Sequence, residues 1–532
     1  MKRCSELKFG FIDAQRYLQD PDDPLSEFFR RSFYKSTHLA KAVDPDIYFL
    51  LGEKGTGKTA YAVYASLFMK DEYNADCEFF DKNDFTRFIE VASNLSIEKS
   101  QYSTLWVFIF LILFVQRLDM RFTCPANGHA RNLIDAVREI NLAGYARTIS
   151  QCIETAAEID AVFASFVEQS GLKVPKHMIS SAKPAFKMTR LIDLCIESLG
   201  ALDSTSQFTV FVDGLDVRPD EVAYPDYLNV VSSICNSVWV LNATQLARIP
   251  PSFKISLLLR PDIFEAVPFQ NRGPKLQNHA HLVEWSAFYR TYQESEIFKF
   301  TDLVLLSQQD DKTDLHPGDT WSRYFPFKIE SRVSEIGDDP FILFLRHSFY
   351  KPRDIIKYLS LMRDLYNQPS HSDAREFGSD VFDDREIRRE FSSYLLQEIR
   401  DQLSFYYTND EYQQFLDFAN GFLGPHVDKR TRVVTYDAFE SAHAEYLAYN
   451  KKNSIKTVPS FATADITLQF MFDLNVLGYY EERTLRSGDK RVFTNYSFRQ
   501  RSFANLRPKV PTGRRYVMHY GVAKSLFVEL GP

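Results

Sequence analysis

Short, continuous apolar runs alternate with longer amphipathic stretches in residues 1–305. The runs Ile47–Leu51 and Phe208–Val212 contain no charged residue, and Lys254–Leu259 contains one only at its start. Unbroken apolar runs of this length are typical of buried parallel strands. His281–Trp285 forms a further strand-like piece. Because helical stretches separate these runs, the pattern predicts an α/β fold with a mainly parallel sheet covered by helices on both faces.

Helical periodicity dominates the remainder of these residues. About 150 residues separate the first predicted strand from the next, and they contain no glycine-rich or low-complexity linker. We therefore expect a helical insertion at about 84–200. The expected helices are Pro24–Ala42 before the first strand, Ser103–Leu118, Ala130–Ser150, Ile153–Gln169 and Met188–Leu199 in the insertion, and Tyr224–Leu241 after the second strand.

After residue 305 the pattern changes to consecutive amphipathic helices, expected at Pro340–Tyr366, Arg385–Tyr407, Asp410–Leu423 and Tyr436–Tyr449. A helix at Thr463–Leu477 then precedes a hairpin, with strands Tyr479–Leu485 and Lys490–Phe498 and a turn at 487–489. A helix followed by a β-wing predicts a winged helix. We expect three domains: a P-loop domain (1–305), a helical lid (306–455) and a winged-helix domain (456–532).

The strongest chemical signal is a phosphate-binding loop between the first predicted strand and a predicted helix. Residues 52–59 read GEKGTGKT, which fits the pattern of a P-loop in the strand–loop–helix context that the motif requires. Gly52, Gly55 and Gly57 allow the backbone N–H groups, including that of Thr56, to turn toward phosphate oxygens. Lys58 is expected to face solvent in the empty loop and to reach the β- and γ-phosphates, and Thr59 to bind Mg²⁺.

A second motif follows the strand at Phe208–Val212, which ends in Asp213-Gly214-Leu215-Asp216. The carboxyl ends of parallel strands meet at one edge of a sheet, where ligands bind. We therefore expect Asp213 to hold Mg²⁺ beside the P-loop. Asp216 is the candidate for polarising the attacking water, although a loop-capping carboxylate is the alternative.

Two arginines are candidates for stabilising charge on the transferred phosphate. Arg260 follows the strand Lys254–Leu259, and Arg353 begins a helix in the predicted lid. For each, a plain ion pair is the alternative: Asp262 or Glu265 for Arg260, and Asp354 or a neighbour for Arg353.

Composition and charge narrow the class of protein. Of the 532 residues, 45% are hydrophobic and 25% charged, which is typical of a soluble globular chain of several domains. The most apolar run, Leu105–Val115, is about half as long as a membrane-spanning helix, so we expect a buried helix. The cysteines are scattered singly and the N-terminus has no secretory apolar region, which favours a cytoplasmic protein without a membrane contact.

A basic segment interrupts the net charge of −7. Between Arg483 and Arg515, Asp489 is the sole acidic residue. Such a block on an acidic protein indicates a local contact with something anionic. Residues 483–515 could contact DNA or RNA through arginines, with Phe493, Tyr496, Phe498 and Phe503 stacking on bases; the alternative is an acidic surface of a neighbouring subunit.

The motifs LGEKGTGKTA, VDGLD, LLLRPDIF and YKPRDIIKYL together resemble bacterial P-loop ATPases near the STAND and KAP classes, and more narrowly the family labelled Sll-type. FDLNVLGYY and YVMHYGVAKSLF are similar to the winged-helix end of that family, so the resemblance covers most of residues 25–532. It implies a nucleotide-driven switch, in many relatives part of anti-phage systems. It also implies that Gly214 stands where other ATPases carry a catalytic glutamate. The long repeat array of STAND sensors is missing from this sequence.

Three functions follow from these observations. The first is a slow, regulated ATPase switch that uses ATP and Mg²⁺ and controls homo-oligomer assembly or a partner effector. The second is a nucleic-acid-stimulated motor or loader that uses the basic winged helix, and the third is a nucleotide-bound scaffold. The guanine-specific Asn-Lys-x-Asp motif is missing from the sequence, which favours ATP over GTP.

Overall fold

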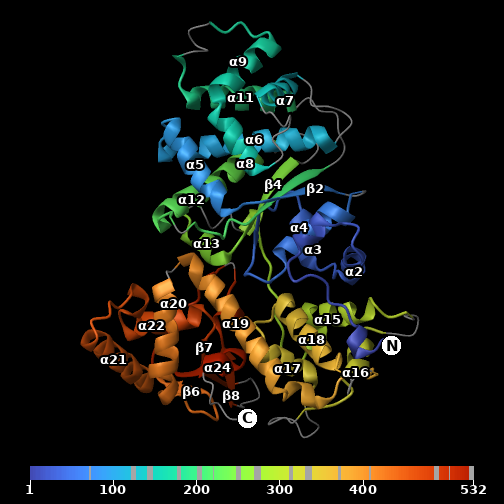
Figure 1. Ribbon diagram of the computed structural model, residues 1–532, viewed down its shortest axis with the longest axis vertical. Coiled ribbons are helices and arrows are strands. Elements are labelled where there is room, and N and C mark those ends of the chain that lie inside the picture. Colours follow the sequence, from blue (N-terminus) through green and yellow to red (C-terminus); the bar gives the residue numbers. More distant parts are fainter. Residues whose placement is uncertain are drawn as a thin grey trace.

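The computed structural model describes residues 1–532 except 71–72, 122–127, 141–147, 176–180, 200–206, 220, 247–252, 269–276, 311–315, 330–337, 369–372, 407–408, 485–489, 503 and 527–532. A helical layer lies at the top of the molecule, a sheet at its centre, and two groups of helices below the sheet (Figure 1).

The central sheet has five parallel strands in the order β2-β3-β4-β1-β5. They are β1 (Phe49–Leu51), β2 (Asn74–Phe79), β3 (Phe208–Asp213), β4 (Phe253–Leu259) and β5 (Ala280–Leu282). In the register, Leu51 lies opposite both Leu259 and Leu282. The expected α/β fold is confirmed, and β4 separates the P-loop strand from the strand that ends in Asp213.

Strand β2 was not predicted, because its alternating carboxylates hide the apolar pattern. Asp76 and Glu78 are both buried, and both pair with Arg117, at 3.6 and 2.5 Å. Arg117 lies on the insertion helix α6 (Tyr102–Arg121). These ion pairs therefore connect the edge strand of the sheet to the helical insertion.

The insertion is helical, as expected, and covers one face of the sheet (Figure 1). Its helices are α5 (Lys82–Asn94), α6, α7 (Gly128–Ile140), α8 (Ile149–Ala157), α9 (Ile159–Ser170) and α11 (Pro184–Leu199). Among the described residues, one helical segment, Lys99–Arg117, is apolar and long enough to cross a membrane, and 72% of it is buried in the fold. Its apolar side chains belong to the main core cluster of the insertion and sheet, which accounts for the composition of Leu105–Val115.

The other face of the sheet is covered by α4 (Lys58–Phe68) and by two N-terminal helices, where the sequence predicted one. α2 (Pro24–Ser32) and α3 (Thr37–Val43) are separate because the Ser36 side chain accepts the His38 N–H and caps α3. A serine that caps a helix starts a new one, since its side chain satisfies a free backbone N–H. The helix predicted at Tyr224–Leu241 is present as α12 (Tyr224–Val240).

Below the sheet lie the helices of the predicted lid and the C-terminal region. The predicted lid contains α16 (Asp319–Tyr324), α17 (Pro340–His347), α18 (Pro352–Tyr366), α19 (Arg385–Tyr406), α20 (Asn409–Asp417) and α21 (Tyr436–Lys452), and α15 (Glu296–Leu306) precedes it. The C-terminal region contains α22 (Ala464–Asp473), β7 (Leu477–Thr484), β8 (Lys490–Asn495), α23 (Ser497–Gln500), β9 (Arg515–Met518) and α24 (Tyr520–Leu526).

The helix and hairpin expected at the C-terminal end are both present. β7 and β8 pair antiparallel, with Tyr479 opposite Asn495, and they join β9 and β6 (Val433–Thr435) in a four-stranded sheet of order β6-β9-β7-β8. α22 precedes this hairpin in the chain, as the sequence predicts, and the winged-helix assignment stays a prediction.

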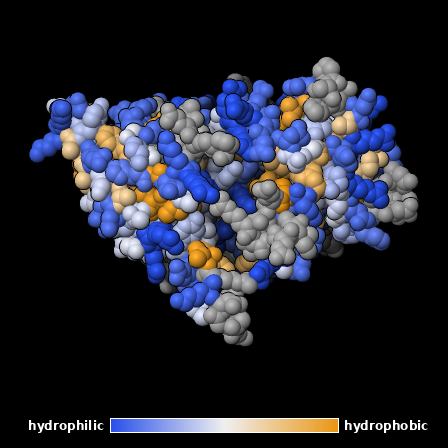
Figure 2. All heavy atoms as spheres, turned by 90° about the horizontal axis from the view of Figure 1, so that it is seen from below, coloured by the Kyte–Doolittle hydropathy of each residue, from blue (hydrophilic) through white to orange (hydrophobic). Residues whose placement is uncertain are grey.

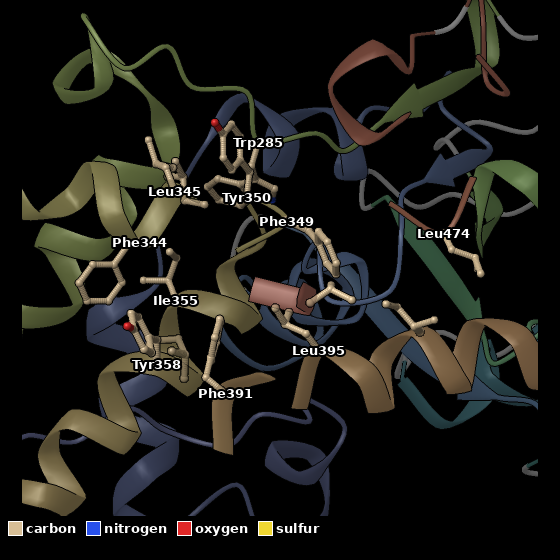
Figure 3. Packing of buried hydrophobic residues seen from close by; sticks show 14 of the residues in the cluster. Trp285, Phe344, Leu345, Phe349, Tyr350, Ile355, Tyr358, Phe391, Leu395 and Leu474 are labelled. Atoms are coloured by element: carbon tan, nitrogen blue, oxygen red, sulfur yellow. The ribbon is translucent and has the colours of Figure 1, made fainter. Parts of the chain in front are cut away.

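The lid and the C-terminal region share one apolar core. Figure 3 shows Phe344, Tyr358, Phe391 and Leu395 of the lid helices and their neighbours packed in one cluster. The same cluster includes Leu258 of the central sheet. The underside of these helices is mainly hydrophilic, with small separate apolar patches (Figure 2). The domain boundaries stay a prediction. The predicted lid and the C-terminal region pack together through this shared core.

Candidate functional site

The P-loop connects β1 to α4, as the sequence predicts. Gly55 and Gly57 have φ values of +86° and +95°, a left-handed conformation that side-chain-bearing residues rarely adopt. α4 begins at Lys58, directly after Gly57. Because the first N–H groups of a helix have no intrahelical partner, this turn presents donors and the positive end of the helix dipole at one place, which suits an anion.

Lys58 is buried, contrary to the expectation that it faces solvent. Its side chain lies behind the loop, where Nζ donates to the carbonyl oxygens of Gly52 at 2.7 Å and Glu53 at 3.2 Å. Burial lowers the pKa of Lys58, while Asp213 and Asp216 oppose that shift. The loop's own carbonyls therefore hold the lysine in place.

The two predicted metal ligands lie together. The Thr59 hydroxyl donates to Asp213 Oδ2 at 2.5 Å, and Asp213 Oδ1 accepts the N–H of Gly214 at 2.8 Å. Burial raises the pKa of Asp213, with Lys58 opposing and Asp216 adding to the shift. A partly buried carboxylate beside a hydroxyl is a donor set that suits Mg²⁺, which prefers oxygen ligands and takes the others from phosphates and water.

Gly214 has a structural reason to be glycine. Its φ is +87°, and a Cβ at this position would lie 2.5 Å from the Phe80 carbonyl oxygen. Phe80 also donates its N–H to the Asp213 carbonyl at 2.8 Å. A larger residue here, such as the glutamate of other ATPases, would separate these two segments.

Most of the predicted site residues line one cavity of about 560 Å³ at the carboxyl edge of the sheet. Lys58, Thr59, Asp213, Asp216 and Arg353 all contribute to its wall, together with Gly55 and Gly57. Arg353 is also 3.6 Å from Glu398 of α19, so the ion pair that the sequence left open as the alternative is present, with Glu398 rather than Asp354 as the partner. The sequence motifs thus converge on one place.

Part of the wall of this cavity is apolar and was missed by sequence reasoning. It is formed by the N-terminal segment around Phe11 and by α2, including Phe29 and Phe33. The rings of Tyr17 and Phe29 stack at 4.2 Å, and Phe33 stacks on Tyr64 of α4 at 3.9 Å. The signal in the sequence was the run of aromatic residues before the first strand, which the helix pattern alone did not connect to the P-loop.

Gly52 and Thr56 shape the loop from behind. A Cβ on Gly52 would lie 2.6 Å from the Thr56 hydroxyl oxygen, and that hydroxyl donates to the Glu53 carbonyl at 2.8 Å. The Thr56 carbonyl accepts the indole N–H of Trp285 at 2.9 Å. Trp285, which follows β5, was not among the predicted site residues.

Arg260 does not line this cavity. Its side chain is buried, and its guanidinium donates to both carboxylate oxygens of Asp262, at 3.1 and 2.5 Å. This is the ion pair that the sequence left open as the alternative. Arg260 borders a small polar space together with Glu53 of the P-loop.

The basic C-terminal segment does not form one free surface. Arg499 bonds the hydroxyl groups of Tyr289 and Tyr350, Arg501 pairs with Glu53, and Arg507 pairs with Asp473 at 2.8 Å. Arg486, Phe503 and the side chain of Arg491 lie outside the described residues. Much of the described positive charge is therefore used in contacts within the chain.

Comparison with protein-family models and with curated proteins finds no match. Among solved structures, the chain is similar to the Aeropyrum pernix ORC2 protein, determined in ADPNP–ADP complexes, with 10% sequence identity and a TM-score of 0.25 over 89% of this chain and 88% of that chain. The fold assignment rests instead on the parallel sheet, the glycine loop between β1 and α4, and Asp213 at the end of β3. These features together are those of a P-loop nucleoside triphosphatase fold.

Proposed function

We propose that this chain binds ATP with Mg²⁺, hydrolyses it slowly, and uses the nucleotide as a switch. One observation carries the proposal: Lys58, Thr59, Asp213 and Asp216 converge on a single cavity of about 560 Å³. This volume lies within the range of small-molecule and cofactor sites. The cavity opens at the carboxyl edge of a parallel sheet, where such folds bind ligands.

Each residue has a role that follows from its chemistry. The N–H groups of the P-loop and Lys58 bind the β- and γ-phosphates. Thr59 and Asp213 hold Mg²⁺, which when bound neutralises phosphate charge. Asp216 accepts a proton from the attacking water. Arg353 contributes positive charge beside the γ-phosphate, where charge develops in the transition state.

Slow turnover is expected from the position of the base. The residue after Asp213 is Gly214, and the nearby Phe80 backbone leaves no room for a side chain at this position. The acid–base role therefore falls to Asp216, three residues beyond Asp213. A base that is less directly placed on the water gives a smaller rate enhancement, since acid–base catalysis depends on hydrogen-bond geometry.

The apolar part of the cavity wall supports a purine base. Phe11, Tyr17, Phe28 and Phe29 belong to this part, and aromatic rings stack well on a planar base. Together with the missing guanine motif, this environment favours adenine over guanine.

The switch is supported by the position of α18, which carries Arg353. The helix begins against the P-loop: the Arg353 N–H is 3.5 Å from the Gly55 carbonyl oxygen. A γ-phosphate that attracts Arg353 would draw the lid toward the sheet, and ADP would release it. The closed form would then assemble with further copies or bind an effector.

The test combines nucleotide binding with particle mass. We expect purified protein to bind one Mg·ATP per chain, to hydrolyse it at or below the low end of ordinary enzyme rates, about 1 s⁻¹, and to change its mass between the ATP and ADP forms. Absence of ATP binding at millimolar concentration would refute the nucleotide site. If Mg·ATP bound but neither the particle mass nor the contact with an effector changed, the protein would be a simple ATPase and the assembly switch would be excluded.

A second function, a nucleic-acid-stimulated ATPase, is favoured by one surface feature. A cavity of about 400 Å³ is lined by Phe288 and Phe493, which are 75% and 38% exposed, and by Arg483, which lies 5.4 Å above the Phe493 ring. Exposed rings beside arginine suit stacked bases. Under this alternative, Phe288→Ala with Phe493→Ala weakens binding of single-stranded DNA and removes its stimulation of turnover. Unchanged affinity would exclude it.

A further inference from the structure

The second residue of the P-loop, Glu53, is held by two cations from distant parts of the chain. Its carboxylate pairs with Lys351 at 2.8 Å and with Arg501. The exposed fractions of the side chains are 14% for Glu53 and 9% for each cation. Glu53 borders the small polar space behind the loop, whereas Lys58 and Thr59 line the nucleotide cavity. The contact is therefore buried and lies on the side of the loop away from the proposed phosphates.

Both cations belong to the parts of the molecule below the sheet. Lys351 lies directly before the first residue of α18 in the lid. Arg501 directly follows α23, beside the β7–β8 hairpin, and lies 448 residues after Glu53 in the sequence. The next P-loop residue, Lys54, pairs with Asp401 of α19. Two consecutive residues of the loop are thus tied to the lid and the C-terminal region.

The charges in this contact persist at neutral pH. Burial alone would raise the pKa of Glu53, but Arg501 and Lys351 outweigh it and lower the pKa to about 2. Removing one partner from a buried ion pair leaves an uncompensated charge, which is costly. The segment that carries the charge must then rearrange or admit water.

Glu53 also connects this contact to the phosphate-binding lysine. Its main-chain carbonyl accepts Lys58 Nζ at 3.2 Å and the Thr56 hydroxyl at 2.8 Å. The side chain of Glu53 therefore fixes the carbonyl that holds Lys58. A path of direct contacts runs from Arg501 through Glu53 to Lys58.

We propose that Arg501 and Lys351 are positioning residues of the nucleotide site: through Glu53 they hold the P-loop in its phosphate-binding shape, so that the C-terminal region sets nucleotide affinity. The proposal rests on the proposed function, since it concerns the same loop. Residues at the start of α18 lie on both sides of that loop: Lys351 lies behind the loop and Arg353 lines the cavity. Displacement of the C-terminal region by a partner would then weaken nucleotide binding without touching the cavity.

The experiment is a double-mutant cycle on nucleotide affinity. We expect Arg501→Gln and Glu53→Gln each to raise the Kd for Mg·ATP about tenfold, and kcat to stay within about twofold, because the loop contacts phosphate in both the ground and transition states. The double variant should be no worse than Glu53→Gln alone, since Arg501 acts on the loop through Glu53. Arg501→Lys should restore most of the affinity.

Arg507→Gln is the matched control. Arg507 also pairs with a carboxylate of the C-terminal region, Asp473, but its side chain is 55% exposed, and exposed ion pairs contribute little. We expect its Kd for Mg·ATP to equal that of the wild-type protein. An unchanged Kd in Arg501→Gln, or effects of the two single variants that multiply in the double variant, would overturn the proposal.

Amide hydrogen exchange of nucleotide-free protein separates this proposal from the proposed function. We expect exchange in residues 52–59 to rise in Arg501→Gln and Glu53→Gln but not in Arg507→Gln. If wild-type protein bound no ATP while exchange rose, the nucleotide function would fail and the contact would stand. If Arg501→Gln did not fold, the near-isosteric Glu53→Gln carries the test, and unchanged exchange and Kd there would overturn the proposal.

Discussion

The two sides of the P-loop differ in how their residues are brought together. On the cavity side, Lys58 and Thr59 belong to one short motif, and Asp213 reaches Thr59 because two parallel strands end at the same edge. Behind the loop, Glu53 meets a lid residue and Arg501, which lies 448 residues away. The chemistry is thus encoded locally, whereas the positioning depends on the whole tertiary structure. Mutations on the two sides should therefore differ in kind: loss of direct phosphate contacts or of chemistry on the cavity side, and loss of loop positioning or stability on the side behind the loop.

The largest effect is expected from Lys58 on the cavity side. Lys58→Ala removes a charged donor to the β- and γ-phosphates, and hydrogen bonds to charged groups contribute about 1.5–3 kcal/mol each, so we expect ATP affinity to fall about 100-fold. Because Lys58 is buried, Lys58→Met, which keeps the volume of the side chain, serves as the control for folding. Calorimetric titration with Mg·ATP measures the loss, and wild-type affinity in a folded Lys58→Met protein would contradict the site.

Asp216 should separate chemistry from binding on the same side. Asp216→Asn keeps the shape of the side chain but cannot accept the proton of water, so turnover should fall about 100-fold or more. ATP should remain bound, because the ground-state contacts of the phosphates are unchanged. Single-turnover hydrolysis and filter retention of labelled ATP measure both quantities. Turnover at the wild-type rate would show that the base is another residue.

The two candidate arginines, Arg353 and Arg260, test directly whether the two sides of the P-loop differ in their effects on turnover and stability. Arg353 lines the cavity, so Arg353→Ala should lower turnover about 100-fold with little change in stability. Arg260 is buried against Asp262, and breaking such a pair costs about 3 kcal/mol. Arg260→Ala should therefore act mainly on the free energy of unfolding and less on turnover. Denaturant unfolding and steady-state rates on both variants check the contrast. The opposite pattern, with Arg260 controlling turnover, would assign the γ-phosphate contact to it.

Much of the cavity side could be predicted from sequence because its signals are short-range. The glycine spacing around Lys58, and an apolar strand ending in Asp213, are local patterns whose convergence follows from the geometry of a parallel sheet. Arg353 could be found in the same way, from its place at the start of a helix. Arg260 shows the limit: position at a strand end could not say whether Asp262 or a phosphate would take the guanidinium.

The parts that sequence reasoning missed depend on tertiary contacts. β2 was hidden because Asp76 and Glu78, which pair with Arg117, break its apolar pattern. The aromatic part of the cavity wall needs the N-terminal segment to fold back onto α4, and no local pattern encodes that contact. Similarly, the sequence predicts that the basic segment is a surface for a partner, whereas Arg501 pairs with Glu53 within the chain. A charge run does not reveal which of its members will be satisfied inside the chain.

The smallest effect is a pH dependence at the start of the lid helix. Asp354 is buried beside Lys351, Glu398 and Tyr394; its carboxylate accepts the Phe349 N–H at 2.8 Å and the Tyr394 hydroxyl at 2.9 Å, and burial raises its pKa to about 6. Between pH 4 and 6 the folded protein thus holds a proton that the unfolded chain releases, so this group stabilises the fold at low pH and the contribution is lost as pH rises through 6. Asp354→Asn cannot ionise, so its unfolding free energy relative to wild type should increase by about 2 kcal/mol from pH 4.5 to pH 7. Urea unfolding at both pH values measures this difference.

Asp364→Asn, at an exposed position on the same helix, is the control and should change stability by less than about 0.5 kcal/mol at either pH. If the Asp354→Asn and wild-type curves stayed parallel from pH 4.5 to pH 7, Asp354 would be ionised throughout.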